Sequence, residues 1–221
     1  MNDREAYDLV QETFNLIKVA KNEPDLDSIP EKLGIRKYDP LTYPRIKFTL
    51  LPSEIEDLKE AGLLNDDYSL NNEVSKKIKD PLAKILYSIL WKKGELNRVR
   101  LTAMGVVGGK KCKHLNEDRV VLYHLGESLS GRPNSPIIDQ HVIRAFAIYK
   151  ANGEIQIFRK IDSLTKKHCA LIIGYKKWLV SNELKQLRAK VVDYSYQVDK
   201  VLYAVGKQVK LKKGTAQLYR S

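Results

Sequence analysis

Apolar residues recur at helical spacing along most of this chain, and this periodicity limits its fold more than any other feature. The first stripe, mostly at intervals of three or four residues, consists of Ala6, Leu9, Val10, Phe14, Ile17 and Ala20. Residues spaced in this way share one face of an α-helix, which then packs against a core. Helical patterns joined by short turns continue to about residue 209, including two helices expected over about 162–180 and 183–209. We therefore predict an all-α fold, a helical bundle.

Two segments depart from helical periodicity. Polar and apolar residues alternate from Arg45 to Leu50, which predicts a short strand or an extended arm near residues 44–50. The stretch from Gly105 to Lys111 is rich in glycine and lysine, so we expect a basic loop there.

A helix with a broad apolar face is expected to begin at Asp80-Pro81. Asp80 can cap a helix N-terminus, and Pro81 suits the first helical position. Its broad apolar face consists of Leu82, Ile85, Leu86, Ile89, Leu90 and Trp91. A face of this width predicts a helix that crosses the core and ends at Gly94.

The charge balance points to a polyanionic partner. The 221 residues include 39 Lys and Arg against 27 Asp and Glu, a formal net charge of +12. Such an excess attracts polyanions and speeds encounter with them, so nucleic acid is the favoured partner. A membrane surface, an acidic partner and a surface tuned only for solubility are the alternatives.

The cysteines and histidines do not indicate a metal site. Cys112 and Cys169 lack paired-ligand spacing, which excludes an iron–sulfur cluster or zinc knuckle built from cysteines alone. Metal-ligand spacing is also missing for His114, His124 and His168, so we expect no catalytic metal and no cofactor. Two free thiols suit a reducing cytoplasm, with one disulfide as the alternative.

The chain shows no sign of export or of membrane insertion. Its first residues are charged, so we expect no signal peptide. No apolar run approaches the roughly 18–20 residues of a membrane span. We therefore expect a cytoplasmic monomer that does not bind membranes, associated with the nucleoid if the source is prokaryotic.

The most informative segment runs from Pro136 to Phe146. A proline-containing turn delivers Asp139 to the start of a helix, and Val142, Ala145 and Phe146 anchor that helix to the core. Taken alone, Asp139 is most simply a helix N-cap.

Two further motifs accompany Asp139. A helical stretch from Glu117 to Gly126 follows the glycine-rich loop, and the pattern Asp-x-x-Leu-aromatic-x-x-Gly-Lys extends from Asp199 to Lys207. Together they make residues 80–210 resemble the helix-hairpin-helix DNA glycosylase superfamily, nearest the archaeal GO branch, which removes oxidised guanine. The resemblance implies a glycosylase-like core at residues 80–210. It leaves open whether residues 1–79 complete the bundle or form a recognition module, and treats 211–221 as a basic tail.

The resemblance assigns the chemistry to Asp139. In that family the aspartate stabilises the positive charge that develops on the deoxyribose as the base leaves, or activates the nucleophile. The base is first rotated out of double-stranded DNA into a pocket. The implied reaction is hydrolysis of the N-glycosidic bond of a damaged or modified base.

The expected lysine nucleophile is missing. Bifunctional members carry a lysine where this chain has Arg119, and an arginine cannot form a Schiff base. We therefore expect a monofunctional glycosylase, with lyase activity in doubt. Lys110, Lys111 or Lys113 could substitute if the loop folds inward.

The hairpin also departs from the family pattern, because Leu-Pro-Gly-x-Gly is not present. Backbone amides at Gly105, Gly108 and Gly109, with Lys113 beside them, have suitable chemistry for binding a DNA phosphate. The alternative is an ordinary flexible loop.

Several other residues are candidates for DNA contact. Gln140 could read a base edge, and His141 could contact DNA or the flipped base. Either Tyr123 or Tyr203 could line the base pocket, and Arg144 and Lys207 could contact the DNA backbone. Each also has a structural interpretation as a core or solvated side chain. The alternative function is a non-catalytic nucleic-acid-binding protein on the same fold, regulatory or accessory to genome defence.

Overall fold

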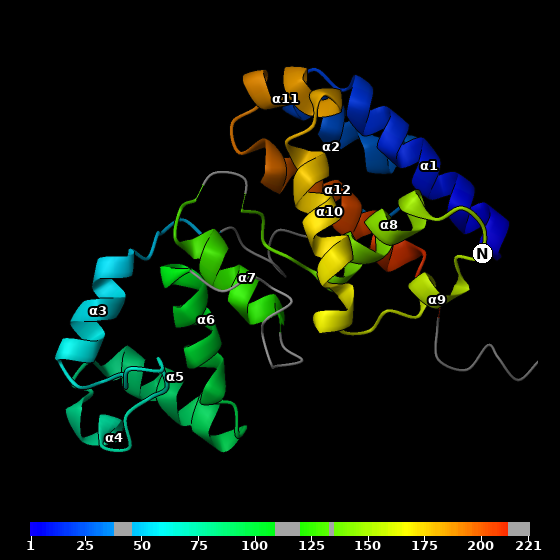
Figure 1. Ribbon diagram of the computed structural model, residues 1–221. Helices are drawn as coiled ribbons and strands as arrows, with labels where there is room; N and C mark the ends of the chain where they lie inside the picture. The colour runs from blue at the N-terminus through cyan, green and yellow to red at the C-terminus, as the bar shows by residue number, and fades with distance from the viewer. Residues whose placement is uncertain (38–45, 109–119, 133–134, 212–221) are drawn as a thin grey trace, which may run out of the picture. The chain divides into compact units, whose positions relative to one another are not determined.

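The computed structural model describes residues 1–37, 46–108, 120–132 and 135–211 (Figure 1). These residues form α-helices and short 3-10 turns with no β-strand among them, and one isolated antiparallel bridge joins Leu64 to Leu70. The predicted all-α fold is confirmed. Residues 46–51 are neither helix nor strand, and the N–H of Leu50 donates to the carbonyl of Leu129 at 2.8 Å. The described part of the predicted strand or arm is therefore not a strand.

The chain divides into two compact units. Unit 1 comprises Met1–Arg45 with Pro136–Ser221, and unit 2 comprises Ile46–Ser135. This division does not coincide with the sequence regions 1–79 and 80–210. The reason is that the N-terminal helices pack onto helices from the end of the chain, which the order of patterns along the sequence cannot show.

Unit 1 contains seven α-helices in its described residues. They are α1 (Asp3–Val19), α2 (Glu23–Lys32), α8 (Gln140–Lys150), α9 (Gln156–Arg159), α10 (Cys169–Leu179), α11 (Lys185–Lys190) and α12 (Tyr194–Gln208), with 3-10 turns η2 (Lys166–His168) and η3 (Asn182–Leu184). α8 lies at the centre, packed against α1, α10 and α12. Phe14, Phe146 and Trp178 join three of these helices in one aromatic cluster, with the rings of Phe14 and Trp178 4.8 Å apart.

The first helix shows how local sequence and packing agree. Asn2 and Glu5 form a capping box, because each side chain accepts a hydrogen bond from the other's backbone N–H, at 2.9 and 2.8 Å. The predicted stripe is buried at Ala6, Val10 and Phe14. The predicted helix is therefore confirmed.

Unit 2 is the smaller of the two units. Its helices are α3 (Pro52–Glu60), α4 (Val74–Lys77), α5 (Pro81–Lys92), α6 (Asn97–Val107) and α7 (Val120–Leu129). The buried centre consists of Ile55, Leu64, Ala103 and Val106. α6 and α7 approach closely at Gly105 and Gly126, where a Cβ on either glycine would lie 2.0 Å from a carbonyl oxygen of the other helix.

The expectation that the helix beginning at Pro81 crosses the core is wrong. Asp80 caps α5 by accepting from the N–H of Ala83 at 2.7 Å, and the helix begins at Pro81 as predicted. No residue of α5 is buried, however, and Leu82 is 62% exposed. An apolar stripe shows that a helix has an apolar face, but it does not show which element covers that face.

The expectation of two free thiols also changes. Cys169 is disulfide-bonded, so two free thiols are not present; the chain's other cysteine, Cys112, lies outside the described residues. In the described part of the chain, no helix has the length and apolar character needed to cross a bilayer.

Candidate functional site

Asp139 begins α8 in unit 1 and is its N-cap. The aspartate backbone is extended, with φ −119° and ψ 148°, and Oδ1 accepts a hydrogen bond from the N–H of His141 at 2.6 Å. Asp139 is half-buried, and no hydrogen bond among the described residues engages its Oδ2. The cap therefore fixes one oxygen of the carboxylate and leaves the other available.

The helix that carries Asp139 is rigidly placed. Seven consecutive residues of α8, from Val142 to Ile148, are buried. α12 packs so closely against its first turn that a Cβ on Gly206 would lie 1.9 Å from the carbonyl oxygen of His141. Only glycine permits this approach, and it brings the side chains of α12 beside the N-terminus of α8.

Arg144 is fully buried under the site. Its Nη1 donates to the carbonyl of Gly206 at 2.6 Å and lies 2.6 Å from Nδ1 of His141, and its Nη2 donates to the carbonyl of Ile161. Burial lowers the pKa of Arg144, while the negative charges of Asp139 and Asp162 act in the opposite direction. The guanidinium thus links the start of α8 to α12 and to the segment after α9.

Arg144 also determines which ring nitrogen of His141 carries the proton. A guanidinium only donates, so Nδ1 of His141 accepts and the ring proton belongs on Nε2. Burial is the main cause that lowers the pKa of His141; Arg144 and Lys210 lower it further, and Asp139 and the carbonyl of Gly206 raise it. Both observations favour the neutral imidazole of His141 with its proton on Nε2.

Two α12 residues, Asp199 and Tyr203, complete the cluster. The hydroxyl of Tyr175 on α10 donates to Asp199. Burial raises the pKa of Asp199 well above its usual value, the bond from Tyr175 opposes this, and the charge of Asp139 adds to the rise. Burial and Asp139 likewise raise the pKa of Tyr203, whose ring meets His141 edge to face at 4.9 Å.

The cluster places one fixed carboxylate, that of Asp139, beside hydrogen-bond donors and an aromatic ring. Asp139 supplies negative charge, a protonated Asp199 and the Nε2–H of His141 can donate, and Tyr203 offers a ring edge. Such a set can stabilise a cation that develops near Asp139 and can hold a planar polar ring. No group of three or more metal-ligating side chains gathers in the described parts of the chain.

Several predicted DNA contacts are corrected by burial. Arg144 is fully buried and bonded to carbonyls, so it cannot hold a phosphate in this structure. Tyr123 is 2% exposed in the core of unit 2, and its ring packs against His124. Gly105 lies inside α6 with its backbone turned to α7, so it offers no free amide to a phosphate.

The remaining predicted residues divide into three groups. Gln140 and His141 are half-buried at the start of α8, beside Asp139, and Lys207 is exposed on α12 with its Nζ 5.9 Å from the centre of the Tyr203 ring. Gly108 ends α6 with a left-handed backbone, φ 79°, against the guanidinium of Arg132. Outside the described residues lie Gly109, Lys110, Lys111, Lys113 and Arg119.

Sequence reasoning missed part of this cluster. Asp199 was noted only as part of the Asp199–Lys207 pattern, whereas Tyr203 was one of two tyrosines expected as candidates to line the base pocket. The four-residue separation of Asp199 and Tyr203 places them on one helical face, which could have indicated Asp199 as well. Tyr175 lies in a different helix with no recognisable motif, and no sequence signal indicates its bond to Asp199.

Comparisons of this chain with protein-family models, with curated proteins and with solved structures find no match. Function therefore has to be argued from the geometry of the Asp139 cluster.

Proposed function

We propose that this protein is a DNA glycosylase of the helix-hairpin-helix type, which hydrolyses the N-glycosidic bond of a damaged or modified base. The observation that carries the proposal is the placement of Asp139. Its carboxylate is half-buried at a helix N-terminus, one oxygen is fixed by the N–H of His141, and the other is not engaged among the described residues.

This geometry suits the reaction electrostatically. As the base leaves, positive charge develops on the deoxyribose, and a preorganised carboxylate nearby lowers the energy of that state. The raised pKa of Asp199 favours its protonated form, and in that form Asp199 adds no second negative charge beside Asp139. Asp139 can then act alone on the sugar, while the donors beside it face the extruded base.

The surface charge supports a DNA substrate. The net charge of +12 favours contact with a polyanion, and Lys207 is exposed beside the cluster on α12. Arg119, at the position expected for a lysine nucleophile, indicates simple hydrolysis without strand cleavage.

A substitution that separates charge from capping tests the proposal. Asn caps helices as well as Asp does, so Asp139→Asn keeps α8 in place and removes the negative charge. With duplexes that each carry one modified base, followed by heating in alkali, we expect wild-type strand breaks at one class of base. The variant should lose about a hundredfold or more in rate.

Asp80→Asn is the matched control, because Asp80 is also an N-cap, at α5. It should leave the rate of base release unchanged. Failure of the wild-type protein to release any base, or full activity of Asp139→Asn, would contradict the proposal.

The second candidate is a non-catalytic nucleic-acid-binding protein on the same fold. The observation that favours it is the capping bond itself, which already accounts structurally for an aspartate at position 139. Retention of duplex binding with no release of any base would support this alternative.

A further inference from the structure

α5 carries an apolar face that no described residue covers. Leu82 is 62% exposed, Ile85 57%, Leu86 53% and Ile89 47%. Their spacing of three, one and three residues places all four on one arc of the helix, about 100° wide. We name these four residues the α5 stripe. Half-buried Ala83, Tyr87 and Leu90 lie to one side of it, so the stripe is not the surface by which α5 packs on unit 2.

The α5 stripe differs from the other exposed apolar residues of the described chain. Ile157 on α9 and Val192 before α12 are exposed singly, and isolated apolar side chains on a surface need no explanation. Four adjacent large side chains on one helix, in contrast, are typical of a protein-interaction surface.

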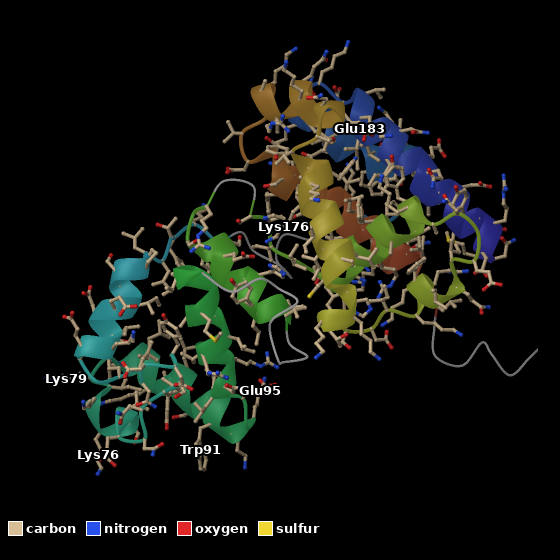
Figure 2. All side chains as sticks on the ribbon, in the orientation of Figure 1. Lys76, Lys79, Trp91, Glu95, Lys176 and Glu183 are labelled. Atoms are coloured by element: carbon tan, nitrogen blue, oxygen red, sulfur yellow. The ribbon has the colours of Figure 1, made fainter. Side chains whose placement is uncertain are left out.

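Lysines border the α5 stripe at both ends. Lys79 precedes α5, and Lys92 and Lys93 follow the stripe; all three are exposed and have no ion pair among the described residues. The neighbouring acids are engaged: Asp80 caps α5 by accepting from the N–H of Ala83, Glu73 pairs with Lys76, and Glu95 pairs with Arg98. Figure 2 labels Lys79 and Glu95 in unit 2. The face is therefore apolar with a cation at each end.

These charges decide between possible occupants. A second copy of α5, packed parallel or antiparallel, would set lysines against lysines at both ends of the stripe, which is unfavourable. A helix that lies on a membrane surface carries its aromatic anchor on the apolar face. Trp91 follows Leu82 by nine residues, about two and a half turns, so its side chain projects from the side of α5 opposite the α5 stripe. Figure 2 shows Trp91 projecting away from the ribbon of unit 2.

We propose that α5 is the docking site for an amphipathic helix of another protein, one that carries acidic residues at both ends of its own apolar stripe. The two stripes would pack ridge into groove, and the acidic residues would meet Lys79, Lys92 and Lys93. This surface belongs to unit 2 and uses no residue of the Asp139 cluster in unit 1, so it goes beyond the proposed reaction.

The test uses full-length protein with isotope-labelled isoleucine methyl groups and two synthetic helical peptides. Both peptides carry the same leucine stripe; one is flanked by glutamates and the other by lysines. We expect the glutamate peptide to shift the methyl signals of Ile85 and Ile89 and to leave those of Ile157 and Ile173 unchanged. Its affinity should fall several-fold between about 0.05 M and about 0.5 M salt.

Two variants make the test specific. Ile85→Asp should weaken binding of the glutamate peptide by about tenfold to a hundredfold, since it removes an exposed apolar side chain that the peptide would cover and adds a charge of the same sign as the glutamates. Ile157→Asp, at a comparably exposed isoleucine of unit 1, should bind as the wild-type protein does.

Four results would each overturn the proposal. They are no binding of the glutamate peptide, equal binding of the lysine peptide, self-association of the protein that Ile85→Asp abolishes, and capture by phosphatidylserine vesicles that depends on Ile85.

Discussion

α8 and α5 are helices of nearly equal length with opposite environments. α8 has 11 residues, seven of them consecutively buried, and the buried run includes the cation of Arg144. α5 has 12 residues, is more apolar on average, and buries none of them. The difference shows that neighbours, more than composition, decide burial. α8 lies among α1, α10 and α12, whereas the described elements around α5 cover only one of its sides.

Matched isoleucine substitutions should produce the largest contrast between the two helices. Ile143 on α8 is fully buried, so Ile143→Asp should lower the free energy of unfolding of unit 1 by about 4 kcal/mol or more, because it buries a charge without a partner. Ile85→Asp on α5 should change stability by no more than about 0.5 kcal/mol.

Urea denaturation followed by far-ultraviolet circular dichroism measures both. Trp178, which is buried in unit 1, reports that unit alone by fluorescence when Trp91 is replaced by phenylalanine. An equal loss of stability in the two variants would show that the α5 stripe is covered, and would contradict the difference in burial between α5 and α8.

Buried charge provides the next test. Arg144→Met leaves the carbonyls of Gly206 and Ile161 without their donor, so unit 1 should lose about 2–5 kcal/mol. Arg4→Met removes an arginine that is 82% exposed and paired with Asp8, and it should cost less than about 1 kcal/mol. Thermal unfolding of the two variants is the measurement. A stable Arg144→Met protein would mean that the buried guanidinium is replaceable by an apolar side chain.

The sequence predicted helix caps and apolar helix faces, but it did not predict which helices pack against one another. The stripe of α1 and the caps at Asp80 and Asp139 were predicted because each depends on residues within one or two turns. Burial of Arg144 was not predicted, since a charged residue in an apolar run is equally consistent with a surface position. Its carbonyl partners lie 17 and 62 residues away in the chain.

A left-handed residue between α11 and α12 is a second feature that the sequence did not predict. The pattern over 183–209 predicts one helix, but the structure has α11 and α12, separated where Asp193 adopts a left-handed backbone with φ 52°. Non-glycine residues rarely adopt this conformation, and no local pattern signals it. The bond between Tyr175 and Asp199 also could not be predicted, because it depends on how α10 packs against α12.

Close helix contacts should respond similarly in both units. Gly206→Ala in unit 1 would place a Cβ 1.9 Å from the carbonyl oxygen of His141, and Gly105→Ala in unit 2 would place one 2.0 Å from that of Tyr123. Either change should cost about 1–3 kcal/mol by forcing the paired helices apart. Gly174→Ala on α10, whose Cβ would lie 3.3 Å from a ring carbon of Phe146, should cost less. Equal melting temperatures for all three variants would contradict these close approaches.

The smallest expected effect concerns pH and unit 1. The raised pKa of Asp199 means that the folded state keeps a proton that the unfolded state releases above the usual value of 3.8. Stability contributed by protonated Asp199 is complete below that value and is lost as pH rises through the raised pKa. His141 has the opposite sign: its lowered pKa makes the unfolded state bind more protons below the usual value of 6.5, so stability falls as pH falls there.

Asp199→Asn separates the two contributions. Asn cannot titrate and can still accept from the hydroxyl of Tyr175, so the fall in melting temperature with rising pH should flatten, while the effect of His141 persists. Asp8→Asn on the exposed face of α1 serves as the control for the loss of one carboxylate elsewhere in unit 1. If Asp199→Asn retains the wild-type profile, the carboxyl of Asp199 is ionised in the folded protein, and two negative charges, not one, lie beside the substrate in the proposed site.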